Sequence, residues 1–216
     1  MMVVAIDGPA ASGKSSVAKG LAEQLGFSYI NTGAMYRALT WHALRMGADV
    51  NSPSQVAAAT DAADISTGFD QGRSYIAIGG FRPYDELHEP AVNRSVSAVS
   101  SVPQVRERLV DEIRRLAATC DCVVEGRDIG SVVFPATPYK LYLDASPEVR
   151  QRRRNSQGQD DEVSARDRID SSRLTAPLTI ASDAMVIDTT ELDLEEVIAA
   201  SYDALIAKGL PACPHA

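Results

Sequence analysis

The chain has 216 residues, of which 45% are hydrophobic and 23% are charged, enough apolar material for one packed domain and too much for a disordered chain. The net charge of −8 argues against a protein that tracks DNA or RNA, because such binding rests on many basic contacts to phosphates. This net charge does not exclude the binding of one small phosphorylated ligand in a local basic pocket. No apolar run is as long as a membrane-spanning helix requires, and no basic leader precedes Asp7. The three sparse cysteines predict free thiols in a reducing cytoplasm.

The first predicted elements alternate between strand and helix. An apolar run over Met2 to Ile6 predicts a buried strand, and glycine-rich punctuation separates it from a helix that begins near Lys14. Apolar residues recur every four positions in that helix, and Gly26 ends it as a C′ glycine does. A second strand is predicted over Phe27 to Ile30, followed by a helix that Thr32 caps.

The pattern changes between residues 60 and 100. Ile65 to Phe69 and Tyr75 to Ile78 are separated by a short polar turn and predict a β-hairpin. Pro90 marks a break in the pattern after this hairpin. A helix is predicted to begin near Pro103. We therefore expect residues 60–100 to form an insertion into a regular α/β core.

The alternation then resumes. Strands are predicted over three short apolar runs, Cys122 to Val124, Tyr139 to Leu143 and Met185 to Ile187. Ser146 and the two residues after it are typical of a helix start, and Asp193 with Glu196 resembles a capping box before a final helix. The tail from Gly209 is expected to be frayed. Strands alternating with helices predict a parallel α/β sheet covered on both faces.

Residues 8–15 fit the pattern G-x-x-x-x-G-K-[ST] in full, with a strand before and a helix after. Glycines let the backbone curl so that several N–H groups point at an anion, and the helix N-terminus adds its dipole. Lys14 would reach the β- and γ-phosphates, and the Ser15 hydroxyl would bind Mg²⁺. The motif predicts a nucleoside triphosphate with Mg²⁺, and a glycine turn with a solvated lysine is disfavoured because motif and context agree. We expect the whole loop to bind the nucleotide, namely Gly8, Pro9, Ala10, Ala11, Ser12, Gly13, Lys14, Ser15 and Ser16.

A kinase also needs a second anion site, and arginine suits it because its planar fork binds phosphate oxygens bidentately. Arg37 lies on the second predicted helix, and Arg127 follows a strand at the carboxyl edge, where open α/β sheets bind ligands. Arg150, Arg153 and Arg154 share one helix face through i, i+3 and i+4 spacing. One arginine on a helix is usually a solvated charge, but the clustering of these residues favours a ligand role.

Two carboxylates beside this cluster each have two interpretations. Glu125 ends an apolar strand, where P-loop proteins usually place an acid that orients Mg²⁺ or its water, or it is an ordinary strand-end carboxylate. Asp128 is either a residue of a loop turn or an acceptor for a base amino group, and the residues alone leave these two interpretations even.

At these residues the sequence resembles the bacterial cytidylate kinase family. The matching segments are Ile6 to Ser15, Asn31 to Arg37, Glu125 to Gly130, Val132 to Pro135 and Ala176 to Leu178. The phosphate loop is shared by many families, whereas the tyrosine–arginine segment and the G-R-D-I-G segment are much more specific to this one. The resemblance implies a P-loop nucleoside monophosphate kinase that transfers the γ-phosphate of ATP to CMP or dCMP, with Mg²⁺, in pyrimidine nucleotide metabolism. We expect a cytoplasmic monomer that binds nucleotides and neither a nucleic acid polymer nor a membrane.

The resemblance also implies a role for each matching residue. Catalytic roles fall on Lys14, Arg37, Arg127 and Arg154. Arg150 and Arg153 would contact ATP from a mobile lid that excludes water, and Ser15 and Glu125 would hold Mg²⁺, directly or through water. The substrate would be bound by Thr32, Arg37, Ser97, Arg106, Arg127, Asp128, Arg166, Asp170 and Arg173.

Within that substrate set, Arg37 and Arg127 would hold the CMP phosphate with Thr32 nearby. Ser97, Arg106 and Asp128 would read the cytosine, because a carboxylate can accept from the exocyclic amine that uracil lacks. The ribose would be contacted by Arg166, Asp170 and Arg173.

These expectations describe a single P-loop kinase domain over residues 1–216. Its core would comprise 1–59, 101–150 and 174–208, with a monophosphate-binding insertion over 60–100, a short lid over 151–173 and a frayed tail over 209–216. Two alternatives remain. A small-metabolite kinase of the shikimate type shares the phosphate loop but has no need of the hairpin insertion. A non-enzymatic nucleotide switch predicts slow hydrolysis without an acceptor, and the two arginine segments argue against it.

Overall fold

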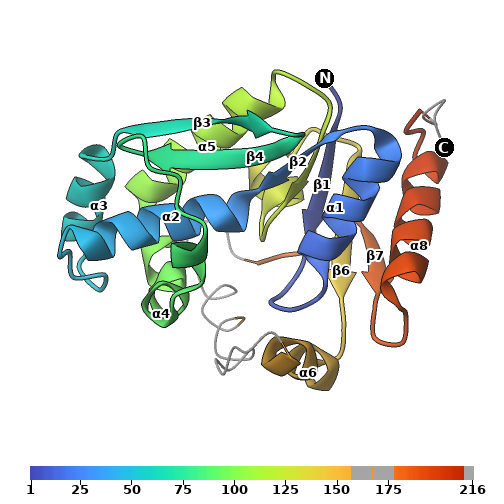
Figure 1. Ribbon diagram of the computed structural model, residues 1–216. Helices are drawn as coiled ribbons and strands as arrows, with labels where there is room; N and C mark the ends of the chain where they lie inside the picture. The colour runs from blue at the N-terminus through green and yellow to red at the C-terminus, as the bar shows by residue number, and fades with distance from the viewer. Residues whose placement is uncertain (157–166, 168–177, 212–216) are drawn as a thin grey trace. The chain divides into compact units, whose positions relative to one another are not determined.

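The structure, a computed structural model, describes residues 1–156, 167 and 178–211 (Figure 1). The chain divides into two compact units. Unit 1 comprises Met1–Ile30 and Cys120–Ala216, and unit 2 comprises Asn31–Thr119. Unit 2 therefore extends beyond the expected insertion over residues 60–100 on both sides.

Unit 1 is built on a sheet whose strands follow the order β2-β5-β1-β6-β7. The central strand β1 (Val3–Asp7) pairs in parallel with β5 (Cys122–Glu125) and β6 (Tyr139–Asp144), and β6 pairs in parallel with β7 (Met185–Asp188). On the far side of β5 lies β2 (Ser28–Asn31). The apolar runs predict these strands correctly, because a parallel sheet buries both faces and excludes alternation with polar residues.

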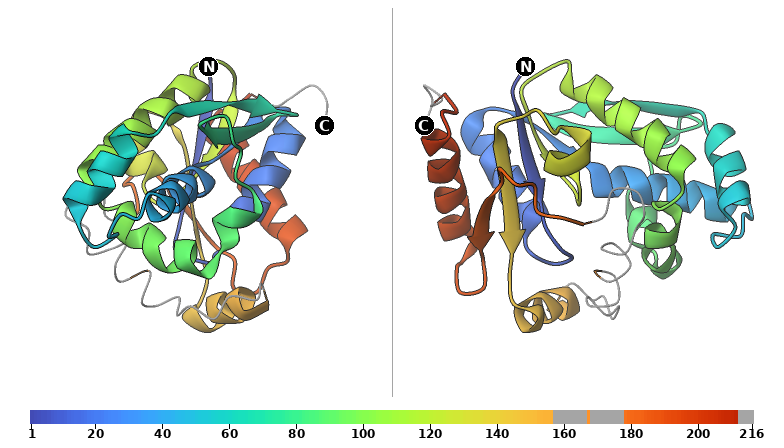
Figure 2. Two further views of the ribbon diagram at one scale, coloured as in Figure 1. Left: turned by 60° about the vertical axis from the view of Figure 1, so that its left-hand side comes forward. Right: turned by 180° about the vertical axis from the view of Figure 1, so that it is seen from behind.

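Helices cover both faces of this sheet, as predicted. The helices α1 (Lys14–Leu25) and α8 (Leu194–Ala207) pack against each other on one face, drawn in blue and red in Figure 1. A single π-helical turn, η2 (Ile129–Val133), packs against β1 on the other face, which the view from behind shows (Figure 2). The core between α1, α8 and the sheet includes Val4, Ile6, Val17, Leu21, Leu25, Val123, Leu141, Leu143, Val197 and Leu205.

The predicted helix ends of unit 1 are mostly confirmed. Gly26 ends α1 with φ 67°, and its N–H donates to Ala22 and Glu23 carbonyl oxygens. Asp193 and Glu196 form the predicted capping box, in which each side chain accepts the other residue's backbone N–H at 2.9 Å. In the predicted frayed tail, Leu210 is buried in the core of unit 1, while residues 212–216 lie outside the described residues.

Unit 2 is centred on α2 (Thr32–Arg45), which contacts the hairpin and the other helices of the unit. The hairpin appears where it is predicted, as antiparallel β3 (Ile65–Asp70) and β4 (Arg73–Ile78). The helix predicted near Pro103 is α5 (Pro103–Ala117), which contacts α2 and β3. The hairpin and α5 therefore follow directly from the spacing of apolar and polar residues.

Unit 2 also contains helices that the sequence patterns do not predict. These are α3 (Pro53–Asp61), α4 (Pro90–Val99) and the short 3₁₀ helix η1 (Asp85–His88). Both α-helices begin with a proline, which interrupts a pattern along the sequence but is well tolerated in the first turn of a helix. The sequence patterns mark a boundary at Pro90 but do not predict that a helix begins there.

The cap of α2 differs from the prediction by one residue. Asn31, and not Thr32, is the N-cap, because the Asn31 side chain accepts the Ala34 N–H at 2.9 Å. Thr32 is instead the first helical residue and is buried. Among the described residues, no helix is long and apolar enough to span a membrane.

Candidate active site

The phosphate loop connects β1 to α1, and its glycines adopt the positive φ values that let the backbone curl. Gly8 has φ 151°, and a Cβ atom there would lie 2.1 Å from the Leu143 carbonyl oxygen, so no other residue fits without moving β6. Gly13 has φ 93° and is the N-cap residue of α1. Ala11 adopts a left-handed φ of 59°, which is uncommon for a residue with a side chain and typical of functional loops.

Lys14 folds back over this loop. Its Nζ donates to the Pro9 carbonyl oxygen at 2.6 Å and lies 3.4 Å from Ser12 Oγ, and the side chain is buried. Burial, with the charge of Arg127 as the next cause, lowers the pKa of Lys14 to about 7. Negative charge from a bound phosphate would raise this pKa again, since an opposite charge favours the protonated amine.

Ser15 and Glu125, the predicted Mg²⁺ ligands, are in contact. Ser15 Oγ donates to Glu125 Oε1 at 2.8 Å, and the Tyr29 hydroxyl donates to the same oxygen at 3.2 Å. Both are hard oxygen donors of the kind that Mg²⁺ prefers, and Mg²⁺ usually takes only one or two protein ligands beside phosphate and water. No group of three or more His, Cys, Asp or Glu that could hold a metal occurs in the described part of the chain. This donor set therefore suits Mg²⁺ bound together with a nucleotide.

Arg127 and Asp128 follow β5 directly, at the carboxyl edge of the sheet. Arg127 NH1 donates to the Gly8 carbonyl oxygen at 2.7 Å, so its guanidinium lies against the phosphate loop. Asp128 is buried and is the residue before η2, and its carbonyl oxygen accepts the Val132 and Val133 N–H groups. Both residues lie where open α/β sheets bind their ligands.

Asp7, the last residue of β1, belongs to this site although it is not among the predicted site residues. Its two carboxylate oxygens accept the N–H groups of Ile129 at 2.6 Å and Gly130 at 2.7 Å. Burial raises the pKa of Asp7 to about 6, although the two N–H groups oppose this shift. The signal that could have found it is an acid that ends a buried apolar strand directly before a phosphate loop.

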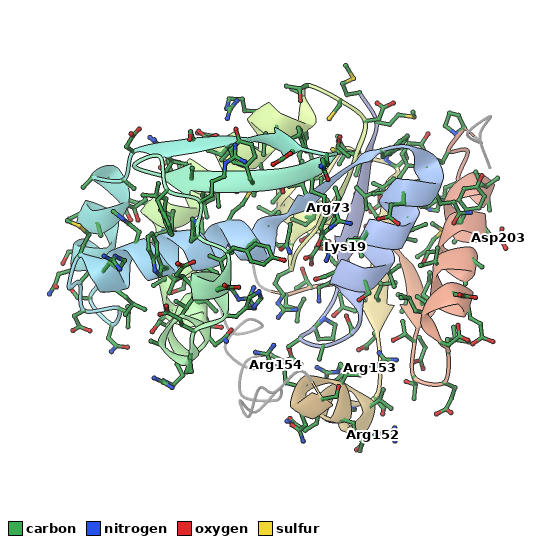
Figure 3. All side chains as sticks on the ribbon, in the orientation of Figure 1. Lys19, Arg73, Arg152, Arg153, Arg154 and Asp203 are labelled. Atoms are coloured by element: carbon green, nitrogen blue, oxygen red, sulfur yellow. The ribbon has the colours of Figure 1, made fainter. Side chains whose placement is uncertain are left out.

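The arginines of α6 (Pro147–Ser156) lie as their spacing predicts. Figure 3 shows Arg153 and Arg154 on the side of α6 toward α1, with Arg152 on the opposite side. Arg154 is buried and Arg152 is exposed. Arg153 donates to the Thr189 hydroxyl at 2.9 Å and to the Thr189 carbonyl oxygen at 2.7 Å.

Arg150 connects α6 to the phosphate loop. Its Nε donates to the Ala145 carbonyl oxygen at 3.0 Å, and its NH1 donates to the Ala10 carbonyl oxygen at 3.3 Å and to the Asp167 carboxylate. Asp167, also absent from the predicted site residues, accepts the Ala10 N–H at 3.0 Å. A carboxylate thus accepts a hydrogen bond from an N–H group of the phosphate loop, and such N–H groups bind phosphate oxygens in loops of this kind.

Four predicted substrate residues lie in unit 2. Thr32 and Arg37 are on α2, Ser97 is on α4 and Arg106 is in the first turn of α5. Ser97 and Arg106 are buried, and the Arg106 guanidinium lies 5.9 Å from the centre of the Tyr36 ring. Since α2 packs on both α4 and α5, the fold of unit 2 gathers these residues on three neighbouring helices.

The remaining substrate residues are divided between unit 1 and the undescribed part of the chain. Arg127 and Asp128 belong to unit 1. Arg166, Asp170 and Arg173 lie outside the described residues, so the predicted contacts to the ribose stay predictions. The same holds for most of the predicted lid.

A model of the family described as "Cytidylate kinase" matches residues 4–205. The chain is 46% identical over 209 residues to "Cytidylate kinase" of Rhodococcus jostii (strain RHA1), with 91% of each chain covered. It is 46% identical over 215 residues to the protein of that name from Mycobacterium leprae (strain Br4923), with 94% of each covered. The crystal structure of an uncharacterized protein from Eubacterium ventriosum ATCC 27560 matches with TM-score 0.50 at 12% identity, over 96% of this chain and 99% of that one, which bears on the fold alone.

Proposed function

The chain belongs to the cytidylate kinase family, and we propose that it transfers the γ-phosphoryl group of ATP to CMP or dCMP. The fold and family that the sequence predicts are confirmed by these relatives. One observation carries the proposal for the site, namely that the phosphate loop of unit 1 brings Lys14 and Arg127 against one stretch of backbone and Ser15 against Glu125.

The phosphate loop would bind the triphosphate of ATP. Its N–H groups and the N-terminus of α1 supply donors, and the Lys14 ammonium supplies positive charge for the β- and γ-phosphates. Ser15 and Glu125 would hold Mg²⁺, which would supply positive charge to neutralise the phosphates of ATP. The Ser15–Glu125 hydrogen bond supports this assignment because it already places both donors together.

The residues proposed to bind the acceptor belong partly to unit 1 and partly to unit 2. We infer that Arg37 and Arg127 hold the CMP phosphate and that Thr32 lies near it. Ser97, Arg106 and Asp128 would read the cytosine, with Asp128 accepting from the exocyclic amine. The burial of Ser97, Arg106 and Asp128 supports this assignment, because polar groups held away from water discriminate between ligands more strongly than exposed ones.

The reaction needs positioning and charge neutralisation more than acid–base catalysis. An oxygen of the CMP phosphate attacks the γ-phosphorus, and the bond to the β–γ bridging oxygen breaks to leave ADP. This oxygen is already largely deprotonated at neutral pH, since the second pKa of a phosphate monoester is about 6. Lys14, Arg37, Arg127 and Arg154 would neutralise the charge that builds up on the transferred group. Arg150 and Arg153 would hold the ATP phosphates from α6 and help to exclude water.

Direct detection of CDP tests the proposal. Purified protein incubated with ATP, Mg²⁺ and CMP should convert CMP to CDP with one ADP formed per CDP, as measured by ³¹P NMR. A shikimate-type kinase would form a phosphorylated product from shikimate and none from CMP. A nucleotide switch would release ADP and inorganic phosphate slowly, with CMP unchanged.

We further infer a monomeric cytoplasmic enzyme. The proposed roles use the side chains of one chain, and both substrates are metabolites of the cytoplasm. Sedimentation velocity at assay concentration tests the first inference, and a dimer at that concentration would contradict it.

A further inference from the structure

We propose that Asp7 is a positioning residue, whose carboxylate holds the turn formed by Arg127 and Asp128 in the conformation that binds the acceptor monophosphate. The inference rests on the proposed function, since it concerns the same site, but its contacts all lie within unit 1. It gives a role to a buried acid that the phosphoryl transfer itself does not use.

Asp7 binds the segment after β5 with both of its oxygens. Oδ1 accepts the Ile129 N–H at 2.6 Å and Oδ2 accepts the Gly130 N–H at 2.7 Å. Two bonds to successive N–H groups fix both the position and the rotation of that backbone, which one bond would leave free to pivot. The N–H groups belong to the first turn of η2, where no earlier carbonyl of the turn can accept them.

The residue after Asp7 binds Arg127, on the other side of Asp128. Arg127 NH1 donates to the carbonyl oxygen of Gly8, the residue after Asp7, at 2.7 Å. Asp128 therefore lies between two residues that are hydrogen-bonded to the last residue of β1 and to the first residue of the phosphate loop. Movement of the Asp7 carboxylate would thus displace the two residues that we place on the phosphate and the base of CMP.

Packing closes the space around this contact. A Cβ atom on Gly130 would lie 3.3 Å from Asp7 Oδ2 and 3.0 Å from Lys140 Cδ. The Lys140 ammonium is held away from Asp7 by Pro135 and Asp183, each at 2.8 Å. Since Gly130 is confined between Asp7 and the Lys140 stem, the η2 segment has little freedom to find another arrangement.

A buried carboxylate is costly, so its presence here calls for a role that an amide could not fill. An asparagine has one acceptor oxygen, and its NH₂ group would face a second N–H donor. The charged or titratable groups around Asp7 are Lys14 on α1, Asp128 before η2, and Tyr142 with Lys140 on β6. Burial is the largest influence on the carboxyl and raises its pKa to about 6, so it titrates in an accessible range.

Backbone NMR tests whether the Asp7 carboxylate controls the turn of Arg127 and Asp128. The wild-type protein is used without nucleotide, so that no phosphate group of a substrate titrates in the same pH range. The amide resonances of Ile129 and Gly130 should shift with a midpoint near pH 6, and those of Arg127 and Asp128 should follow the same midpoint. The Lys14→Met variant should still show this titration, with its midpoint raised, because the charge of Lys14 lowers the pKa of Asp7, whereas a signal that comes from Lys14 itself, near pH 7, would disappear. If Ile129 and Gly130 move while Arg127 and Asp128 do not, the carboxylate does not control the acceptor turn and the proposal is overturned.

Steady-state kinetics of Asp7→Asn test the consequence for the acceptor. We expect the KM for CMP to rise about tenfold or more and the preference for CMP over UMP to fall, because a small misplacement of positioning groups is costly. The KM for ATP should change much less. The matched control is Asp121→Asn, since Asp121 also accepts a backbone N–H, that of Met2 at 2.6 Å, next to the opposite end of β1. Equal KM values for CMP in the two variants would overturn the proposal.

The outcomes separate the two claims. If the wild-type protein does not phosphorylate CMP, the proposed function fails, whereas the NMR titration still reports whether Asp7 controls the turn. If CMP is phosphorylated and Asp7→Asn behaves like Asp121→Asn, the function stands and the positioning role fails. If Asp7→Asn does not fold, the titration of the wild-type protein alone decides.

Discussion

Ser15 Oγ donates a hydrogen bond to Glu125 Oε1 at 2.8 Å, which joins the first turn of α1 to the end of β5 across 110 positions of the sequence. The two residues come from neighbouring elements of unit 1, because β5 pairs with β1 and β1 leads through the phosphate loop into α1. The pair brings together, from distant positions in the chain, the two residues that we propose as ligands of Mg²⁺.

Removing either member of this pair should weaken the binding of Mg²⁺ and slow the reaction. We expect Ser15→Ala and Glu125→Gln each to lower kcat by about 100-fold or more and to raise the Mg²⁺ concentration needed for half-maximal rate. Tyr29→Phe is the graded comparison, since it removes a bond to the same Glu125 oxygen but leaves Ser15 in place, and it should have a smaller effect. A wild-type Mg²⁺ titration in Glu125→Gln would remove Glu125 from the proposed metal site.

Binding of ATP should be accompanied by proton uptake at Lys14. Burial lowers the pKa of this amine to about 7, so it is mostly neutral at pH 8, and phosphate would raise the pKa and charge it. Calorimetry at pH 8 in buffers of different ionisation enthalpy should show net proton uptake in the wild-type protein and much less in Lys14→Met. The same shift predicts that the free energy of unfolding of the wild type, relative to Lys14→Met, rises between about pH 7 and pH 10, because the unfolded state holds the proton longer. Equal uptake in both proteins would contradict the assignment.

Arginine substitutions should separate the donor and acceptor sides. Arg37→Ala is expected to raise the KM for CMP by about 100-fold, to lower kcat and to leave the KM for ATP nearly unchanged, because we place Arg37 on the CMP phosphate and on the group in transfer and give it no other contact to ATP. Arg127→Ala should raise both KM values, since Arg127 also binds the Gly8 carbonyl oxygen of the phosphate loop. Arg152→Ala is the matched control on the exposed side of α6 (Figure 3) and should leave both values unchanged. An unchanged KM for CMP in Arg37→Ala would exclude it from the acceptor site.

Gly8→Ala should abolish ATP binding for a steric reason. Its Cβ atom would lie 2.1 Å from the Leu143 carbonyl oxygen, so the loop or β6 must shift. Gly26→Ala is the control, because Gly26 also has a positive φ but a Cβ atom there would meet no other atom within 4 Å. Gly26→Ala should lower the free energy of unfolding by about 1 kcal/mol and leave the KM for ATP unchanged. Urea denaturation and ATP titration of the two variants measure both effects, and ATP binding by Gly8→Ala at wild-type affinity would contradict the loop geometry.

Much of the fold could be predicted because its signals are local. The hairpin, the capping box of Asp193 and Glu196, and the phosphate loop each depend on residues that lie close together in the sequence. The apolar strands also follow from composition, since both faces of the sheet are buried. The helix that begins at Pro90 could not be predicted in this way because a proline that breaks one pattern can equally begin a helix, and local sequence does not distinguish the two.

The site residues that escape prediction depend on contacts that no local pattern contains. Asp7 meets Ile129 from 122 positions away, and Asp167 meets Ala10 from 157 positions away. The one-residue error at the cap of α2 has a local cause instead, because Asn31 and Thr32 are neighbours and both residue types can cap a helix. Lys14, Ser15 and Arg127 can be identified from sequence because a motif or a strand end marks each of them, although their roles remain predictions.

The central claim is that this chain phosphorylates CMP, and the most direct measurement is kcat/KM for a panel of nucleoside monophosphates in an ADP-release assay with ATP and Mg²⁺. We predict that CMP and dCMP are used far better than UMP, AMP and GMP, because the buried Asp128 carboxylate would pair with the exocyclic amine of cytosine and be left unpaired by uracil. Activity on AMP with none on CMP would contradict it.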